Sequence, residues 1–376
     1  SSIVLFTGLM IGVGYSRFKE QPEHTGEYIG LLLFSASGAM IMTAFTDMFM
    51  FFLGLEILSL PIYVMAGSNK KNVRSTEASL KYFLMGSFST GILLLGITLI
   101  YGANGSFHLS APMIIPTKGF AMEQYLLSAG LILIFSAMNF KVSAAPFHFW
   151  TPDVYDGAPT IFTMFMSTVV KTAGFAAIYH IFAGVFGGLY ATWVMPVYFI
   201  SMFTLVIGNV TAVYQQSVKR MLAYSSISHA GYMLLTVSAR QSSSTSSILF
   251  YSLAYTLATL TAFAVFKLVS EYQTGRTEKP ANFQSFEGLA KNNPFLAFCF
   301  TVSLLSLAGI PLTAGFWGKF FVFTDTFNRN IVYPIILAIL MSAVGIYYYF
   351  KGIIAVYFKQ GDIQKIEIST LYQVAL

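Results

Sequence analysis

The feature that most constrains this chain is a succession of long apolar runs separated by short polar loops. A helix that crosses a bilayer needs about 20 mainly apolar residues. Charged residues make up only 10% of the chain, whereas an average soluble domain carries about 25%, so these residues cannot cover a water-facing surface of ordinary size. The sequence therefore predicts an integral membrane protein. Its eleven candidate spans are 1–15, 28–46, 48–66, 76–102, 122–145, 159–184, 190–213, 222–239, 247–269, 293–327 and 331–357.

The runs favour helices over a transmembrane barrel. Small residues are interspersed with leucine and phenylalanine, as in packed membrane helices, whereas a barrel strand has about 10 residues of alternating polarity. We therefore expect an all-α, polytopic membrane protein with eleven transmembrane helices in this chain. The composition excludes a soluble enzyme, a disordered chain and a disulfide scaffold. The single cysteine, Cys299, can form neither an intrachain disulfide nor a cysteine-ligated iron–sulfur site.

The basic residues divide unevenly between the two sides of the membrane. When the loops are assigned alternately, one side receives twelve lysines and arginines and the other receives three. Cytoplasmic loops carry an excess of these residues, so the first side is predicted to be cytoplasmic. Topology then explains the pI near 9.1 without a nucleic-acid partner, and the lipid bilayer is the predicted surrounding. The first set is Arg17, Lys19, Lys70, Lys71, Arg74, Lys219, Arg220, Arg276, Lys279, Lys291, Lys359 and Lys365, and the second is Lys118, Arg240 and Arg329.

Two candidate spans contain a proline in mid-run. Pro146 follows Lys141 in one span, and Pro311 precedes Lys319 in the other. Proline removes a helix hydrogen bond and clashes with the preceding turn, so each span is predicted to be discontinuous. Interrupted spans in corresponding positions are typical of transporters built from inverted repeats. The odd number of spans from one break to the next inverts the second unit relative to the first.

The breaks suggest a division of the chain into four parts. Residues 1–27 are expected to form a partial N-terminal membrane helix and loop, 28–187 the first five-helix inverted repeat, 188–358 the second, and 359–376 a truncated C-terminal segment. The chain opens with Ser1 and has no signal-type charged start, so we expect a piece of a longer protein.

Ionisable residues inside the apolar runs are the candidates for function, because a charge near the bilayer centre costs about 2.5–3.5 kcal/mol on insertion scales. Glu56 has no charged neighbour in sequence between Asp47 and Lys70. Lys81 follows in the next span, and the two are predicted to approach one another in a helical hairpin. The alternative for Lys81 is that its side chain extends to the interface, since Arg74 lies only seven residues before it.

Three further lysines are candidates for proton transfer. Lys171 sits in the centre of its run, and Lys141 and Lys319 border the two breaks, where freed carbonyls and a water-lined cavity could solvate an ammonium. Burial disfavours the charged form of a lysine, so a lysine in this setting is suited to accept and release protons. Lys267 and Lys351 lie nearer the ends of their spans, and we expect both to extend to the interface.

Two histidines, His148 and His229, have an intramembrane context. Histidine titrates near neutrality, which suits a proton relay. A hydrogen-bonded structural histidine is an equally open interpretation of each.

Several polar residues have simpler interpretations. Asp153 and Asp156 follow the first break, where helix capping is expected, and Lys219 with Arg220 suits a cytoplasmic anchor. No CxxC, phosphate-binding glycine loop or HExxH motif occurs. The chain is therefore predicted to move charge without a redox, nucleotide or metal site of its own.

Six motifs in this order resemble those of a known family. They are GLEILSLPIY (54–63), EASLKYF (77–83), FKVSAAPFHFWTPDVY (140–155), DGAPT (156–160), KRMLAYSSISH (219–229), and GIP through GKF (309–320). Together they cover most of the chain, and the sequence resembles the antiporter-like membrane subunits of respiratory NADH–quinone oxidoreductase (complex I), in particular subunit N.

The resemblance implies a fourteen-helix subunit in which helices four to eight and nine to thirteen form inverted repeats, so that this chain would hold helices three to thirteen. It implies a proton path through Glu56, Lys81, Lys141, Lys171 and Lys319. It also implies a multi-pass protein of the bacterial cytoplasmic (inner) membrane. The expected partners are the other membrane-arm subunits, further antiporter-like subunits among them. FMN, iron–sulfur clusters and quinone are expected in partner subunits and no cofactor on this chain.

The sequence therefore predicts a proton-translocating subunit. Quinone chemistry elsewhere would change the Glu56–Lys81 interaction, and this would alter the proton affinity of Lys171 and then of Lys141 and Lys319. Two alternatives stay open: a subunit of a multi-subunit cation/proton antiporter, and a non-pumping structural subunit of a membrane arm.

Overall fold

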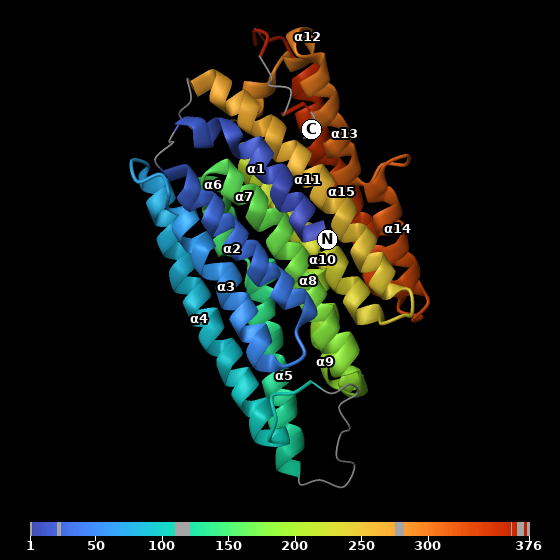
Figure 1. The fold of residues 1–376 in the computed structure, drawn as a ribbon. Coiled ribbons are helices and arrows are strands. Elements are labelled where there is room, and N and C mark those ends of the chain that lie inside the picture. The colour runs from blue at the N-terminus through green and yellow to red at the C-terminus, as the bar shows by residue number, and fades with distance from the viewer. Residues whose placement is uncertain are drawn as a thin grey trace.

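The computed structural model describes residues 2–20, 24–109, 121–274, 282–361, 363–366 and 372–373. These residues form a bundle of long helices (Figure 1) and contain no strand beyond isolated bridges. Lys118, Arg276 and Lys279 lie outside the described residues. The long helices are α1 (Ser2–Glu20), α2 (Thr25–Ala44), α3 (Met48–Ala66), α4 (Val73–Asn104), α5 (Ala121–Val142), α9 (Tyr190–Val213), α10 (Val218–Ala239), α11 (Ser244–Thr274) and α15 (Val332–Tyr357).

Shorter elements fill the rest of the bundle. They are α6 (Trp150–Gly157), α7 (Thr160–Phe165), α8 (Lys171–Ile178), α12 (Leu289–Asn292), α13 (Pro294–Ala308) and α14 (Ala314–Phe327), the π-helical segments η2 (Met166–Val170) and η3 (Tyr179–Val185), and the 3₁₀ turns η4 (Gly187–Leu189) and η5 (Phe283–Phe286). Several helices begin at polar caps. The side chains of Asp47, Asn72 and Ser217 accept hydrogen bonds from the first turns of α3, α4 and α10, and these bonds satisfy amides that a helix leaves free.

Eight helical segments in the described part of the chain are long and apolar enough to cross a bilayer. They overlap eight of the eleven spans that the sequence predicts. The helix Ser2–Gly14 and α13 are apolar but shorter. The fold is therefore an all-helical membrane fold, whereas the count of eleven crossings stays a prediction.

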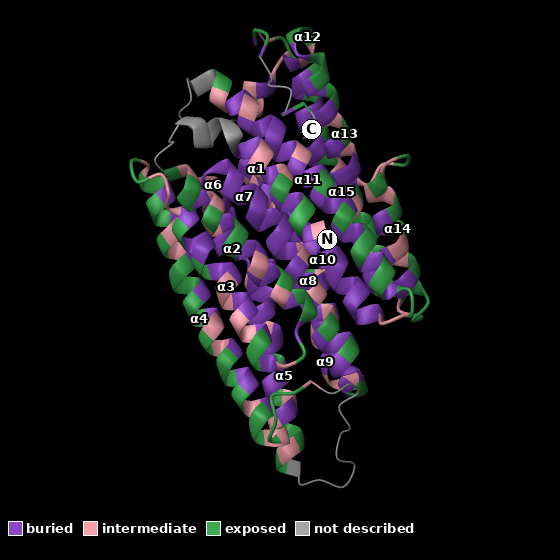
Figure 2. Cartoon of the chain, viewed as in Figure 1, coloured by how far each residue is buried: buried purple, intermediate pink, exposed green. Residues whose placement is uncertain are grey.

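Burial follows position in the bundle rather than hydropathy alone. Figure 2 shows α10 and the segment from α7 to α8 buried at the centre, while α4 and α14 carry many exposed residues at opposite flanks. Phe88 of α4 is 74% exposed and Phe320 of α14 is 48% exposed. Exposed phenylalanines are expected where a helix faces lipid.

Small residues bring some helices into close contact. A Cβ atom added at Gly38 of α2 would lie 2.3 Å from the backbone nitrogen of Leu58 of α3. One added at Gly208 of α9 would lie 2.6 Å from the backbone nitrogen of Ser228 of α10. Without a strong hydrophobic force between helices in lipid, such close packing is a main source of their association.

Both predicted breaks are present. Helix α5 ends at Val142, Ser143 takes a left-handed φ of 64°, and the chain resumes a helix only at Trp150. Helix α13 ends at Ala308, Gly309 has a φ of 80°, and α14 begins at Ala314. The two-fold relation between the repeats stays a prediction, and its boundary at 187/188 falls in η4.

Candidate functional site

Lys141 lies at the end of α5, beside the first break, and only 3% of its surface is exposed. Its Nζ donates to Ser59 Oγ at 2.6 Å and to the Tyr82 hydroxyl at 3.5 Å. The break explains this arrangement, because the chain after Val142 turns away and leaves room for the ammonium among hydroxyls. The structure shows no ion-pair partner for Lys141 among the residues it describes.

Lys171 lies in the centre of the bundle and is 1% exposed. Its Nζ donates to the backbone carbonyl of Ser226 on α10 at 2.5 Å. The π-helical segment η2 ends one residue before Lys171. Such segments widen the helix by one residue and are frequent at functional sites, and this one was not predicted from the sequence.

Lys319 lies in the first half of α14, below the second break, and is 6% exposed. Its Nζ donates to the Ala308 carbonyl at 2.8 Å and to Ser342 Oγ at 2.9 Å, and it lies 4.9 Å from the centre of the Tyr232 ring. Two features favour glycine at position 309: the backbone has a left-handed φ, and Lys319 lies close to it. An added Cβ would lie 2.7 Å from Lys319 Cδ.

The prediction that Glu56 and Lys81 approach one another is wrong. Glu56 Oε1 accepts a hydrogen bond from Thr90 Oγ1 at 2.9 Å. Lys81 lies nine residues before Thr90 on α4, which is about 13 Å along a helix. The Glu56 carboxylate instead lies close enough to Lys141 for the two charges to interact. This follows from α3, where Glu56 precedes by three residues the Ser59 that binds Lys141.

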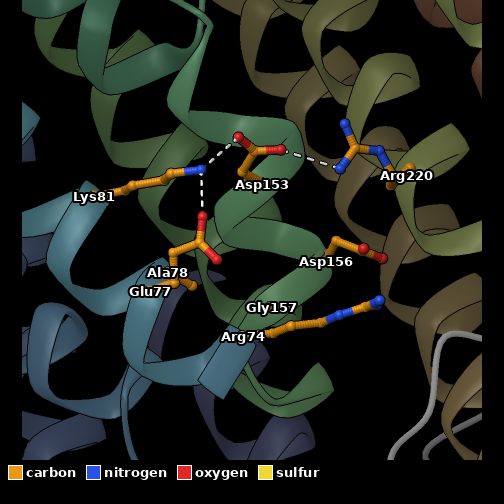
Figure 3. A pocket seen from close by; sticks show the side chains of 8 residues that line it. All are labelled: Arg74, Glu77, Ala78, Lys81, Asp153, Asp156, Gly157 and Arg220. Atoms are coloured by element: carbon orange, nitrogen blue, oxygen red, sulfur yellow. Dashed lines mark hydrogen bonds and ion pairs between the residues drawn. The ribbon is translucent and has the colours of Figure 1, made fainter. Parts of the chain in front are cut away.

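Lys81 belongs to an ionic cluster near the end of the bundle where α4 and α10 begin (Figure 3). Its Nζ lies 2.7 Å from Glu77 Oε1 and 3.0 Å from Asp153 Oδ2, and Asp153 Oδ1 accepts from Arg220 Nη1 at 3.0 Å. Burial raises the pKa of Asp153, but the hydrogen bonds from Lys81 and Arg220 outweigh it, and the net pKa is below its ordinary value. This ionic cluster lines an open cavity of about 220 Å³. Asp153 thus ties α4 to α10 through α6, and the expectation that it only caps a helix is wrong.

Lys219 also differs from its predicted role as an anchor. It is buried, and its Nζ donates to the Ala158 carbonyl at 2.6 Å. It thereby satisfies a carbonyl just after α6, where helix carbonyls lack partners within the helix.

Lys267 and Lys351 were both expected to extend to the interface. Lys267 is fully buried and pairs with Glu271 at 2.9 Å, so the expectation is wrong for this residue. Lys351 is half-buried and donates to the Val213 carbonyl at 2.5 Å. It is held by a neighbouring helix rather than extended into the interface.

His229 lies beside Tyr232, and the Tyr232 ring in turn lies against Lys319 Nζ. Its Nδ1 lies 2.8 Å from the Tyr251 hydroxyl and its Nε2 lies 3.2 Å from the Tyr349 hydroxyl. Tyr349 also forms a short hydrogen bond with Ser225, which is the neighbour of the residue that binds Lys171. His148 is buried beside the first break, and its Nδ1 has no partner in the described part of the chain. It does not join this network.

Several functional side chains were missed from the sequence because they are uncharged. The hydroxyls of Tyr155, Ser226 and Tyr255 are buried and lie close to one another, and none of them makes a hydrogen bond of good geometry among the described residues. Buried polar atoms of this kind are usually satisfied by ordered water. Their positions therefore mark places where water could carry a proton between Lys171 and its neighbours.

The family model described as "NADH:quinone oxidoreductase/Mrp antiporter, TM" matches residues 46–361. The chain belongs to this family. NADH-quinone oxidoreductase subunit N of Cytophaga hutchinsonii is 44% identical over 370 residues, which are 98% of this chain and 77% of the relative. F(420)H(2) dehydrogenase subunit N of Methanosarcina mazei is 33% identical, over 100% of this chain and 77% of the relative.

Solved structures agree with this family. A chain of respiratory complex I from Thermus thermophilus, solved with bound aureothin, superposes with a TM-score of 0.79 at 34% identity, covering 93% of this chain and 75% of that one. A chain of the Mrp complex from Dietzia gives a TM-score of 0.83 at 23% identity, covering 96% and 66%. At that identity the second likeness shows the fold alone. The protein is thus an antiporter-like membrane subunit, and the subunits called N are among its relatives.

Proposed function

We propose that this chain is the proton-translocating subunit N in the membrane arm of an NADH-quinone oxidoreductase. The observation that carries the proposal is the set of three buried lysines, Lys141, Lys171 and Lys319, each held by hydroxyls or carbonyls. None of them has an ion-pair partner in the part of the chain that the structure describes. A lysine that is paired with a carboxylate keeps its proton, whereas a buried, unpaired lysine exchanges it at much lower cost.

The inner part of the relay runs from Glu56 to Lys141. Ser59 lies one turn from Glu56 on α3 and accepts the hydrogen bond of Lys141 Nζ, so a change of charge at Glu56 acts on Lys141 directly. Glu56 is therefore the residue that couples to Lys141. Lys81 instead belongs to the ionic cluster that holds α6 in place. We propose that redox events in partner subunits reach this chain as a change in charge near Glu56.

The outer part of the relay runs from Lys171 to Lys319. Lys171 contacts α10 at Ser226, and the Tyr349 hydroxyl links Ser225 to His229. A neutral imidazole accepts a proton at one nitrogen and donates one at the other, so His229 can pass a proton between tyrosines. Tyr232 then lies between His229 and Lys319, with ring centres of Tyr232 and His229 6.1 Å apart. His148 is left with a structural role.

The energy required is within reach of electrostatic coupling. Moving one elementary charge against 100 mV requires about 2.3 kcal/mol. A change of about two pKa units in a relay group corresponds to a similar free energy. Movement of one charge near Glu56 would act on Lys141 through the electrostatic interaction between the two residues.

We place the electron carriers on partner subunits. In the described residues no group of three or more His, Cys, Asp or Glu side chains converges, and Cys299 lies buried on the apolar helix α13. These donors do not fit an iron–sulfur cluster, which is usually held by several cysteines. FMN, iron–sulfur clusters and quinone would thus be bound by other subunits of the same complex, in the bacterial inner membrane, together with further antiporter-like subunits.

A relative at 33% identity is named for F(420)H(2) dehydrogenase. A second candidate is therefore the same proton-translocating role in a complex with another electron donor. The family model also names the Mrp antiporter, but the likeness to a solved Mrp complex shows the fold alone. We do not favour the antiporter alternative, because relatives at 38–44% identity are named NADH-quinone oxidoreductase subunit N.

The test is purification of the complex through a tag on this chain. NADH-driven quinone reduction with co-purified FMN and iron supports the proposal. Their absence, from membranes that do oxidise NADH, would move the chain to another complex, and reduction driven by F420H2 would identify the second candidate. Sodium-dependent proton exchange without any quinone reduction would instead favour the antiporter, and a charge-neutral Lys171 variant that pumps fully would favour the structural role.

A further inference from the structure

Asp325 is a buried carboxylate that the relay described above does not use. It lies on α14 with 2% of its surface exposed. Its Oδ1 accepts a hydrogen bond from Ser243 Oγ at 2.6 Å, whereas its Oδ2 has no hydrogen-bond partner among the residues that the structure describes. A buried carboxylate oxygen left in this way needs a water molecule or a proton.

Asp325 lies on the buried side of α14, at the edge opposite to Lys319. The buried residues of α14 are Gly318, Lys319, Val322, Asp325 and Thr326, and their spacing of three and four residues places them on one face. Asp325 follows Lys319 by six residues, or about 9 Å along the helix. The exposed Arg329 comes one turn later. Asp325 therefore lies between a relay lysine and the non-cytoplasmic surface.

The position is a poor one for a purely structural carboxylate. Asp325 lies in the last turn of α14, which ends at Phe327. The C-terminal end of a helix carries partial negative charge and favours cations there. Nor does Asp325 form an ion pair in the described part of the chain, because the nearby Arg240 and Arg329 donate to backbone carbonyls instead.

A second unsatisfied group lies on α10, one of the helices that pack against α14. Thr236 of α10 is fully buried, and its hydroxyl has no partner among the described residues. It follows His229 by seven residues, about 10 Å further toward the same end of the bundle. Water bound at Thr236 and at Asp325 Oδ2 would continue the relay beyond Lys319 without a change of protein structure.

We infer that Asp325 receives protons from Lys319 and releases them on the non-cytoplasmic side. In the transfer an N–H bond of the Lys319 ammonium breaks and an O–H bond forms on the Asp325 carboxylate through intervening water. This leaves a neutral amine and a neutral carboxylic acid. The acid then loses its proton to water beside the exposed end of α14. The inference rests on the proposed function and adds a release site to it.

The test uses the assembled complex in inside-out membrane vesicles, with NADH-driven acidification of the lumen and quinone reduction measured together. Asp325→Asn keeps the acceptor for Ser243 but cannot take up a proton, and Asp325→Glu restores the carboxyl group. Ser243→Ala removes the hydrogen bond and leaves the carboxylate. The matched control is Asp47→Asn, since Asp47 lies in a loop on the same side, caps α3 and has no place in the relay.

The inference predicts that Asp325→Asn lowers acidification about tenfold or more, the effect of losing a positioned proton-transfer group. Asp325→Glu should recover most of it, and Ser243→Ala and Asp47→Asn should change it little. The double variant with Lys319→Met should be no worse than Lys319→Met alone, because groups in one path are not additive.

Other outcomes overturn the inference in distinguishable ways. If Asp325→Asn pumps normally while Lys319→Met does not, protons leave elsewhere and only the release site fails. If Ser243→Ala reproduces the loss of Asp325→Asn, the carboxylate merely holds the loop before α11. If Lys319→Met itself pumps normally, the proposed function fails and the release site with it.

Discussion

Replacing Lys171 by methionine should separate function from stability. The side chain is 1% exposed, and the one hydrogen bond described for its Nζ goes to the Ser226 carbonyl, which lies inside α10 and keeps its helical acceptor role. Removing the ammonium recovers about 2.5–3.5 kcal/mol of burial cost and loses a charged hydrogen bond of about 1.5–3 kcal/mol. Methionine has a similar length and fills the same space, so little cavity is formed.

The free energy of unfolding of Lys171→Met should therefore stay equal to that of the wild type or rise by about 1 kcal/mol, which is a shift of about 1–2 °C in melting temperature for a chain of this size. Proton translocation should nevertheless be lost. The measurements are thermal unfolding of the detergent-purified complex, followed through this chain, and NADH-driven acidification in vesicles. Lys351→Met is the matched control, because Lys351 also donates to a helix carbonyl, at Val213, but lies outside the relay.

Two results would refute this reasoning. A loss of about 3 kcal/mol or more, typical of a disrupted core, would mean that Lys171 is there for packing. Full pumping in Lys171→Met would mean that no proton passes through this position. Lys171→Arg adds a further check, because arginine keeps the charge but does not release its proton, and it should also fail to pump.

Three further predictions concern other parts of the molecule. Asp153→Asn should lower the free energy of unfolding by about 1 kcal/mol at pH 7, as for a partly exposed ion-pair network. The pKa of Asp153 is lowered in the folded protein, so its contribution to stability is present above its unfolded pKa of about 3.9 and is lost as the pH falls through the folded pKa. The melting temperatures of the wild type and the variant should therefore converge at acid pH. His229→Gln should retain hydrogen bonding to a tyrosine and near-normal melting but slow acidification about tenfold; an unchanged rate would make this histidine structural. Gly38→Val should destabilise the protein by several kcal/mol because its Cβ would collide with the backbone of α3, whereas Gly30→Val on the same helix meets open space and should melt near the wild-type temperature.

Much of the fold could be predicted from sequence because its determinants are local. Apolar runs of membrane length and the prolines at 146 and 311 located the helices and both breaks. The buried lysines were predictable for a related reason: a charge far from any loop along the chain has no route to water. The structure confirms the burial of Lys141, Lys171 and Lys319.

What could not be predicted depends on distances between helices. Lys81 pairs with Asp153, 72 residues away, as well as with Glu77. No pattern along α3 and α4 shows this pairing, or that Glu56 binds Thr90 instead of Lys81. The tyrosines that surround His229 were not distinguishable from lipid-facing aromatics until the packing of α10, α11 and α15 was known. The π-helical segment before Lys171 was equally hidden, because it carries no glycine or proline to mark it.

The central position of α10 has a consequence for how the protein is made. Helix α10 contains serines, a histidine and a Lys-Arg pair, which suit it to a proton path. For the same reason it is not among the helices apolar enough to cross a bilayer. A translocon that inserts helices one at a time would insert α10 inefficiently. Its entry should depend on α9 and α11, which flank it in sequence and pack against it. Glycosylation mapping should accordingly show weak insertion of α10 alone and efficient insertion of the three helices together, so that the proton path is completed only after its neighbours are in the membrane.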